Sequence, residues 1–248
     1  MLTAIKRRVP ASWKEWIKAR MGRSSRLYCP VCDQYAAEFQ TFGVIPRRNA
    51  KCPNCGALER HRFVWMFFQR KTALLDGQPK RLLHFAPERW LADHLRKVEN
   101  LDYVTADLFD PNASIRVDIT SMPQIPDASF DFLYCSHVLE HVTDDRRAIR
   151  ECARVLRPEG RAVFMVPIMA SETYEDPSIT DPHERERIFG QHDHVRRYGP
   201  DFIERLQSGG FDVQVFSAKD VVGWRMRRYG IPPHQGPIYY CKVSRQVP

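Results

Sequence analysis

The sequence SFDFLYCSHVLEHVTDDRRAIRECARVLRPEGRAVFMVP, residues 129–167, contains two strand-like runs on either side of one helix-like run. Residues 130–135 and 161–166 are apolar and have the length of buried strands. Residues 144–156 instead repeat apolar side chains at helical spacing, on a face formed by Ala148, Ile149, Cys152, Val155 and Leu156. The Arg-Pro-x-Gly sequence that follows favours a helix end. We therefore predict a strand–helix–strand unit of the kind found in parallel sheets.

The same alternation extends along the chain in both directions. Further strand-like runs lie at residues 81–86, 102–106, 115–119, 211–217 and 238–243. A second helix is predicted at residues 200–207, before a Gly-Gly stop. The turn-rich link at residues 228–237 has no room for a crossover helix, so we expect the last two strands to be antiparallel. These patterns predict an α/β fold with a seven-stranded, mostly parallel sheet whose last strand is antiparallel.

Four of the seven cysteines form two CxxC pairs separated by nineteen residues: Cys29, Cys32, Cys52 and Cys55. This spacing is typical of a small N-terminal zinc ribbon, because each CxxC turn directs two thiolates at one point. Two disulfides and a redox-active CxxC are the alternatives that we consider. Four thiolates fill a tetrahedral coordination sphere, so we expect a structural Zn²⁺. The remaining cysteines, Cys135, Cys152 and Cys241, lie in apolar stretches and are interpreted as buried side chains.

The net charge of +8 comes almost entirely from residues 1–26, which hold eight basic side chains and one acidic one. Trp13, Trp16 and Ile17 would share one face of a helix there. Such a helix could pack on the body, lie on a membrane surface or contact RNA. The segment lacks the apolar core of a signal peptide. We therefore expect a cytoplasmic protein, with peripheral membrane contact through residues 1–26 as one alternative.

Composition changes divide the chain into three parts. Residues 1–26 form the basic amphipathic segment, and residues 27–76 contain the zinc-ribbon module followed by a connecting helix within residues 57–75. A Gly-Gln-Pro break then separates these parts from a domain at residues 77–248.

Residues 125–167 closely resemble the central block of the class I, type 11, S-adenosylmethionine-dependent methyltransferases. The resemblance rests on the Ser-Phe-Asp sequence, the apolar strand, the polar HVLEH turn, and a helix that ends in Arg-Val-Leu-x-Pro-x-Gly before the next strand. A wider similarity runs from about residue 80 to residue 244. It implies a Rossmann-like fold and S-adenosylmethionine as the cofactor.

In that family a glycine-rich loop after the first strand contacts the methionine part of the cofactor. Here the sequence is LLHFAPERWL, in which His84 replaces the usual acid, while Ala86, Glu88 and Trp90 stand at the glycine positions. A subgroup of bacterial methyltransferases is similar to this chain in both its HFAPE loop and its FGQHDHVRRYG segment. Glu88 departs from that pattern, and its carboxylate is expected to pair with the cofactor's α-ammonium group.

The resemblance also implies contacts for the rest of the cofactor. Asp107 follows the second strand, nineteen positions after Glu88, where a carboxylate accepts the ribose hydroxyls. A helix N-cap is the alternative role for Asp107. Asp118 and Ile119 match the site beside the adenine. Ser136 and His137 end the next strand and are expected to contact cofactor or acceptor.

The segment PHERERIFGQHDHVRRYG, residues 182–199, lies where the family places acceptor-binding residues. His192, Asp193 and His194 are adjacent in it, and an Asp–His pair is the usual arrangement for orienting a general base. A second metal site and a solvated loop are the alternatives. Nearby basic residues suggest an anionic acceptor: Arg185, Arg187, Arg196 and Arg197.

These observations predict a methyltransferase that methylates an oxygen of a small-molecule or glycan acceptor. An RNA methyltransferase with a zinc ribbon is one alternative, favoured by the basic N-terminal segment. A catalytically inactive, zinc-bearing scaffold protein is another, favoured by the unusual residues of the cofactor loop.

Overall fold

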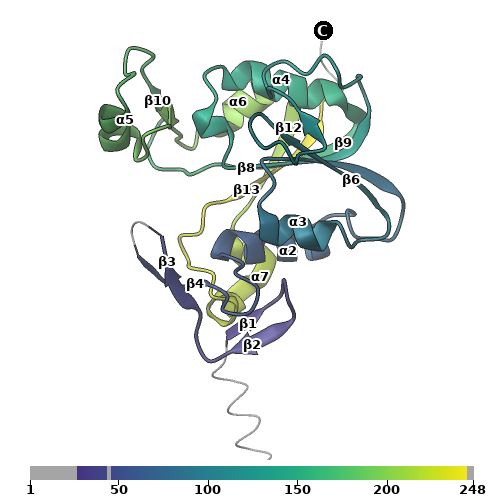
Figure 1. The fold of residues 1–248 in the computed structure, drawn as a ribbon, viewed down its shortest axis with the longest axis vertical. Coiled ribbons are helices and arrows are strands. Elements are labelled where there is room, and N and C mark those ends of the chain that lie inside the picture. Colours follow the sequence, from purple (N-terminus) through teal and green to yellow (C-terminus); the bar gives the residue numbers. More distant parts are fainter. Residues whose placement is uncertain (1–26, 44–45, 245–248) are drawn as a thin grey trace, which may run out of the picture.

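We describe the protein from a computed structural model that places residues 27–43 and 46–244 (Figure 1). The amphipathic segment predicted at residues 1–26 lies outside the described residues. Within the described part, no helix is both long enough and apolar enough to cross a membrane.

The core of the molecule is one seven-stranded sheet with the order β12-β13-β9-β8-β5-β6-β7. Its strands are β5 (Lys80–Phe85), β6 (Leu101–Asp107), β7 (Ile115–Arg116), β8 (Phe130–Ser136), β9 (Leu156–Met165), β12 (Phe211–Phe216) and β13 (Ile238–Val243). Strands β5 to β9 pair in parallel, whereas β13 is antiparallel to both β9 and β12. The sequence prediction of a mostly parallel sheet with an antiparallel last strand is confirmed.

Helices cover both faces of this sheet (Figure 1). On one face, α4 (Asp145–Val155) and α6 (Phe202–Ser208) pack on an apolar cluster that includes side chains of β8 and β9. On the other face, α2 (Glu59–Lys71), α3 (Arg89–Leu95) and α7 (Ala218–Val222) build a second cluster. The two apolar faces explain why the central strands read as continuous apolar runs.

Helix α4 forms where its periodicity predicts. The Asp144 side chain caps the helix by accepting a hydrogen bond from Arg147 N at 2.9 Å. The helix then packs closely on the turn that ends α6, since a Cβ added at Gly209 would lie 2.2 Å from Ile149 Cγ2. Gly209 therefore permits a close approach of two segments that a larger residue would separate.

The structure differs from the sequence prediction at several elements. Strand β9 begins at Leu156, five residues before its predicted start. The strand expected at residues 115–119 pairs over only Ile115–Arg116, because Asp118 Oδ1 accepts hydrogen bonds from both Thr120 N and Oγ1, which turns the chain. The residues before the 228–237 link hold two short elements that the sequence left unassigned, α7 and the 3-10 helix η2 (Gly223–Tyr229). Elements this short carry too few residues for a periodic signal.

The N-terminal part consists of two small antiparallel hairpins, β1 (Leu27–Cys29) with β2 (Gln34–Ala36) and β3 (Gln40–Phe42) with β4 (Arg47–Lys51). We call residues 27–57 the cysteine module. It sits beside α2 and α7 in Figure 1.

Arg62 fixes the cysteine module to the body. Its side chain is fully buried, and its guanidinium donates hydrogen bonds to carbonyl oxygens of Asn49, Ala50, Ala57, Tyr229 and Gly230. These acceptors belong to the module on one side and to the end of η2 on the other. Helix α2, expected as a connector, also packs its Phe63, Phe67 and Phe68 side chains into the core beneath the sheet.

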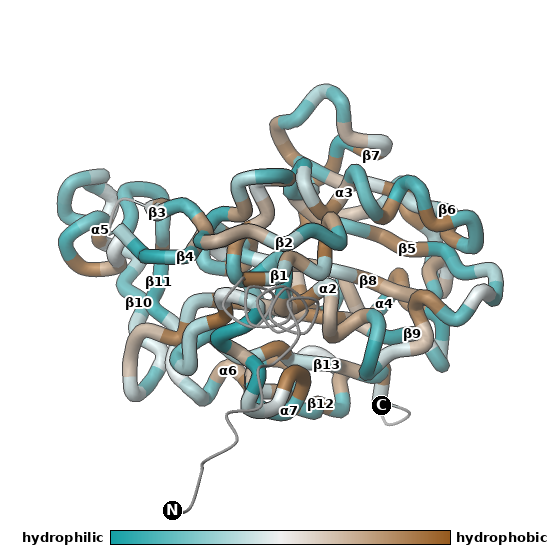
Figure 2. Tube along the Cα trace, turned by 90° about the horizontal axis from the view of Figure 1, so that it is seen from below, coloured by the Kyte–Doolittle hydropathy of each residue, from teal (hydrophilic) through white to brown (hydrophobic). Residues whose placement is uncertain are grey.

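An outer segment follows β9. It contains β10 (Tyr174–Glu175), α5 (Pro182–Phe189) and β11 (Arg196–Arg197), with β10 antiparallel to β11. Figure 2 shows these elements together at one side of the molecule, with α5 largely hydrophilic. The segment carries the histidines that the sequence singled out.

Candidate functional site

A cavity of about 590 Å³ opens at the carboxyl ends of β5, β6 and β8. This is the edge at which open α/β sheets bind their ligands. Five residues predicted for the cofactor line it: Ala86, Asp107, Asp118, Ile119 and His137. The cavity also reaches the 3-10 helix η1 (Leu139–His141) and Asp193 of the outer segment.

The loop after β5 brings the backbone close to the cavity. Ala86 has φ +46°, in the left-handed region that glycine adopts most easily. Its N–H donates to Ala106 O at 2.9 Å, which holds the loop against β6. A small residue with a glycine-like conformation thus stands at the first glycine position of the family's loop.

Asp107 lines the cavity and also caps a turn, rather than the helix that was its alternative role. Its Oδ1 accepts hydrogen bonds from Phe109 N at 2.7 Å and Asp110 N at 2.8 Å, so it caps the turn after β6. Both bonds use Oδ1, and Oδ2 is the atom that we expect to accept ribose hydroxyls. The cap holds the carboxylate in place for a ligand.

Asp118 and Ile119 lie on the same cavity, in the turn that shortens β7. The sequence analysis missed Phe109, which lines the cavity and is 80% exposed. An exposed aromatic ring at a cavity rim suits stacking on a planar ligand. Its sequence signal is only its place two residues after Asp107, in a turn where apolar side chains are uncommon.

His141 and Asp193, which line the cavity, belong to a group of titratable side chains. His141 Nδ1 lies 3.1 Å from Asp193 Oδ2, and the rings of His141 and His194 meet edge to face with centroids 4.7 Å apart. His137 Nδ1 lies 3.0 Å from Glu140 Oε1. We call Glu140, His141, Asp193 and His194 the histidine cluster.

Only two of the three predicted catalytic residues lie at the cavity or contact His141. Asp193 lines the cavity and pairs with His141, and His194 is buried against His141, whereas His192 is exposed and does not line the cavity. Burial lowers the pKa of His194. The partner of Asp193 is thus His141 of η1, which is not one of the three predicted catalytic residues.

The four CxxC cysteines converge as their spacing predicts. Cys29 Sγ lies 3.7 Å from Cys55 Sγ, Cys32 Sγ lies 3.9 Å from Cys52 Sγ, and the four sulfurs all fall within 4.8 Å of one another. Four thiolates around Zn²⁺ at about 2.3 Å would lie about 3.8 Å apart, whereas a disulfide needs about 2.0 Å. The donor set and spacing suit a tetrahedral metal site.

Known proteins are similar in sequence to the part of the chain that forms the seven-stranded sheet. Residues 89–164 match the type 11 family described as "Methyltransferase domain". A "Probable S-adenosylmethionine-dependent methyltransferase" of Mycolicibacterium smegmatis is 33% identical over 170 residues, covering 63% of this chain and 59% of that protein. Residues 89–164 thus match a methyltransferase domain, and a wider part of the chain is similar to S-adenosylmethionine-dependent methyltransferases.

Two solved structures share the fold of the methyltransferase domain. The 4+2 cyclase SpnF matches with a TM-score of 0.52 at 17% identity, covering 74% of this chain and 81% of that chain. An S-adenosylmethionine-dependent methyltransferase of Mesorhizobium loti matches with a TM-score of 0.50 at 15% identity, covering 68% of this chain and 95% of that chain. The chain spans only 59% of the length of its Mycolicibacterium relative.

Three residues predicted for the cofactor lie outside the cavity lining of the methyltransferase domain: His84, Glu88 and Ser136. Ser136 is buried at the end of β8. His84 is fully buried on the face of the sheet that α2 and α3 cover, where its Nδ1 lies 2.7 Å from Tyr103 Oη and its ring packs on Tyr134. Burial lowers the pKa of His84 to about 4.

The depressed pKa of His84 makes stability depend on pH. In the unfolded chain His84 binds a proton near pH 6.5, whereas in the folded protein it stays neutral down to about pH 4. The free energy of unfolding should therefore fall as the pH falls from about 6.5 to about 4, by up to about 1.4 kcal/mol per pH unit from this group. Urea unfolding across this range should show a smaller slope for His84→Gln. An unchanged slope, with the exposed His183→Gln as control, would show that His84 titrates normally.

Glu88 is placed differently from the expectation that it binds the α-ammonium group. Its Oε1 lies 2.7 Å from Arg60 Nε and 2.9 Å from His61 Nε2, both on α2. His61 Nδ1 accepts from Leu58 N at 3.1 Å, so Nε2 carries the proton donated to Glu88. Burial alone would raise the pKa of Glu88, but these partners lower it to about 2. Glu88 therefore joins the cofactor loop to α2.

Trp90 also stands at a glycine position of the family's loop, and like Glu88 it contacts the N-terminal part of the chain. A Cβ added at Gly56 would lie 2.8 Å from Trp90 Cζ2, so the indole packs directly on the backbone after Cys55. Both unusual loop residues thus contact the cysteine module or the helix that leaves it. The two residues that depart from the family's glycine pattern thus pack this loop against the neighbouring module.

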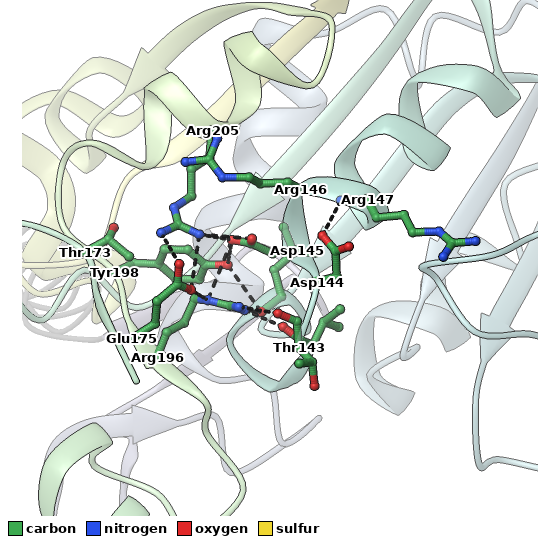
Figure 3. A network of polar contacts seen from close by, with 12 residues as sticks. Thr143, Asp144, Asp145, Arg146, Arg147, Thr173, Glu175, Arg196, Tyr198 and Arg205 are labelled. Carbon is green, nitrogen blue, oxygen red and sulfur yellow. Dashed lines mark hydrogen bonds and ion pairs between the residues drawn. The ribbon is translucent and has the colours of Figure 1, made fainter. Parts of the chain in front are cut away.

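The arginines taken as a signal for an anionic acceptor are already paired. Arg196 is buried, and it pairs with Glu175 and donates to Leu139 O, Val142 O and Thr143 O (Figure 3). Arg197 donates to Ile188 O and Met169 O, Arg185 donates to Ile179 O, and Arg187 lies 3.6 Å from Glu184. These contacts hold the outer segment together, and the anionic acceptor stays a prediction.

Proposed function

We propose that the protein uses S-adenosylmethionine to methylate an oxygen of a small-molecule or glycan acceptor. The observation that carries this proposal is that Ala86, Asp107 and Asp118 line one cavity together with His141 and Asp193 of the histidine cluster. The first three stand where the family binds the cofactor, and the cluster stands where it binds the acceptor. Both substrates would then meet in one cavity.

When bound, S-adenosylmethionine supplies a methyl group made electrophilic by its sulfonium charge. The residues of the chain then have two tasks, alignment of the acceptor and removal of its hydroxyl proton. The histidine cluster fits the second task, because its paired His141 and Asp193 line the same cavity as the cofactor residues. Of the predicted catalytic residues we retain Asp193 and His194, and we assign no contact with the reaction to His192.

We further infer that Cys29, Cys32, Cys52 and Cys55 hold a structural Zn²⁺. Their four thiolates complete a tetrahedron, which leaves no open position for water or substrate. The ion would hold the two hairpins of the cysteine module together, where the buried apolar cluster is small.

Calorimetric titration with S-adenosylmethionine and S-adenosylhomocysteine tests the cofactor part of the proposal. Asp107→Asn keeps a side-chain oxygen that can cap the turn but loses the carboxylate, so it should weaken binding about 10- to 100-fold, in line with about 1.5–3 kcal/mol for hydrogen bonds to a charged group. Asp102→Asn, at the exposed start of β6, serves as the matched control. No binding by folded wild-type protein would reject the enzyme and favour a scaffold role.

A further inference from the structure

The buried carboxylate of Glu140 has one oxygen that accepts no hydrogen bond from the described residues. The side chain is 1% exposed, and its Oε1 lies 3.0 Å from His137 Nδ1. Its second oxygen, Oε2, is buried and has no hydrogen-bond partner among the residues that the structure describes. A buried carboxylate oxygen without a donor is costly, so a ligand that supplies positive charge would stabilise it.

Two histidines converge on the same point. One ligand atom each from Glu140, His141 and His194 lie within 4.8 Å of one another. Donors bound to one ion at about 2.0–2.2 Å lie at most about 4 Å apart, so small side-chain rotations would complete the arrangement. Two imidazoles and one carboxylate form a donor set that transition metals prefer.

The surroundings orient both rings for this purpose. His141 Nδ1 lies 3.1 Å from Asp193 Oδ2, and His194 Nδ1 lies 3.3 Å from Phe189 O. A metal-binding histidine almost always donates its other ring N–H to a carboxylate or a backbone carbonyl. These contacts occupy Nδ1 of each ring and leave Nε2 as the ligating atom. The carboxylates of Glu140 and Asp193 also give the cluster the negative charge that suits a divalent cation.

We propose that Glu140, His141 and His194 bind a divalent first-row transition-metal ion at the acceptor end of the cavity. Three protein ligands leave coordination positions open, and His141 lines the cavity, so an open position faces the acceptor. This inference rests on the proposed function and specifies it: the ion binds the acceptor oxygen and lowers the pKa of its hydroxyl group. The proton then leaves to solvent or Asp193 before the oxygen attacks the methyl carbon and the C–S bond electrons return to sulfur.

Titration of Co²⁺ into the zinc-loaded protein tests the site without any acceptor. One Co²⁺ per chain should bind with the visible absorption of nitrogen and oxygen ligands, and without the sulfur-to-metal charge-transfer bands that exchange into the cysteine module would give. His141→Asn, which changes a partly exposed side chain, should weaken Co²⁺ binding more than 10-fold, and so should the near-isosteric Glu140→Gln. Asp193→Asn, which removes only the partner of His141, should weaken it about 10-fold.

His192→Asn is the matched control, because His192 is adjacent in sequence but exposed. It should leave the Co²⁺ affinity within about twofold of wild type. The proposal is overturned if folded wild-type protein binds no Co²⁺, or if binding survives both Glu140→Gln and His141→Asn. Failure of the metal site with intact S-adenosylhomocysteine binding would leave the proposed methyltransferase standing, whereas loss of cofactor binding in metal-free and metal-loaded protein alike would reject both.

Discussion

Replacing Cys32 by Ser should destabilise the cysteine module and also weaken S-adenosylhomocysteine binding, although no cysteine lines the cavity. If the four thiolates hold Zn²⁺, one lost ligand removes much of a binding free energy that reaches about 10–16 kcal/mol in small zinc modules. We expect the melting temperature to fall by about 10 °C or more, since about 1 kcal/mol shifts it by roughly 2–4 °C at this chain length.

The effect on the cofactor follows from two contacts between the module and the loop after β5. The backbone after Cys55 supports Trp90 at Gly56, and α2 holds Glu88 through Arg60 and His61. Disorder in the module would release both loop residues, and with them the strained conformation of Ala86. A coupling of this kind is typically worth a 5- to 150-fold change in affinity, and we expect about 10-fold.

Cys32→His provides the control, because histidine can replace one cysteine in a structural zinc site. It should retain zinc, measured by elemental analysis, and S-adenosylhomocysteine affinity close to wild type. The substitutions avoid chelators, which would also strip an ion from the histidine cluster. If Cys32→Ser lost zinc but bound S-adenosylhomocysteine as tightly as wild type, the module would not support the cofactor loop.

The sequence predicts those parts of the fold whose signals are local. The strands, α4 and the cysteine module follow from apolar periodicity and from CxxC spacing. Most of them form within a residue or two of the expected ends, but β7 ends three residues early and β9 begins five residues early. Asp107 was predicted from its position after a strand and Asp118 from the family resemblance, and both line the cavity. The outcome for Glu88 could not be predicted in this way, because its partners Arg60 and His61 lie 28 and 27 residues away, in another structural unit.

The contacts of residues 192–194 could not be predicted from local sequence either. Adjacent titratable residues drew attention to His192, Asp193 and His194, but adjacency does not determine which side chains meet. In the structure the segment turns so that Asp193 and His194 face η1, and His192 does not. A backbone hydrogen bond from Val195 N to Glu140 O, at 2.9 Å, fixes this orientation across 55 residues of sequence. Only tertiary pairing supplies that information.

Replacing Asp145 by Asn should destabilise the protein by about 3–5 kcal/mol, the range found when one partner of a buried ion pair is removed. Asp145 is 2% exposed, and its carboxylate accepts from Arg205 Nη1 at 3.0 Å and from Tyr198 Oη at 2.7 Å, while Arg196 Nε lies 3.8 Å away. Figure 3 shows both guanidinium groups converging on this carboxylate beside the Tyr198 ring. Asparagine keeps the shape but loses the charge, so two buried cations would share only the half-exposed Glu175.

The neighbouring residue provides a matched control for this substitution. Asp144 caps α4, and asparagine caps helices about as well as aspartate, so Asp144→Asn should change the free energy of unfolding by less than about 0.5 kcal/mol. Urea unfolding of both variants measures the difference directly. Because Arg196 also holds the carbonyl groups of Leu139 and Thr143, Asp145→Asn should loosen the outer segment and weaken Co²⁺ binding at the histidine cluster. Equally small losses in the free energy of unfolding of the two variants would mean that the ion pairs of Asp145 add little to stability. The position of His194 would then depend on backbone hydrogen bonds alone.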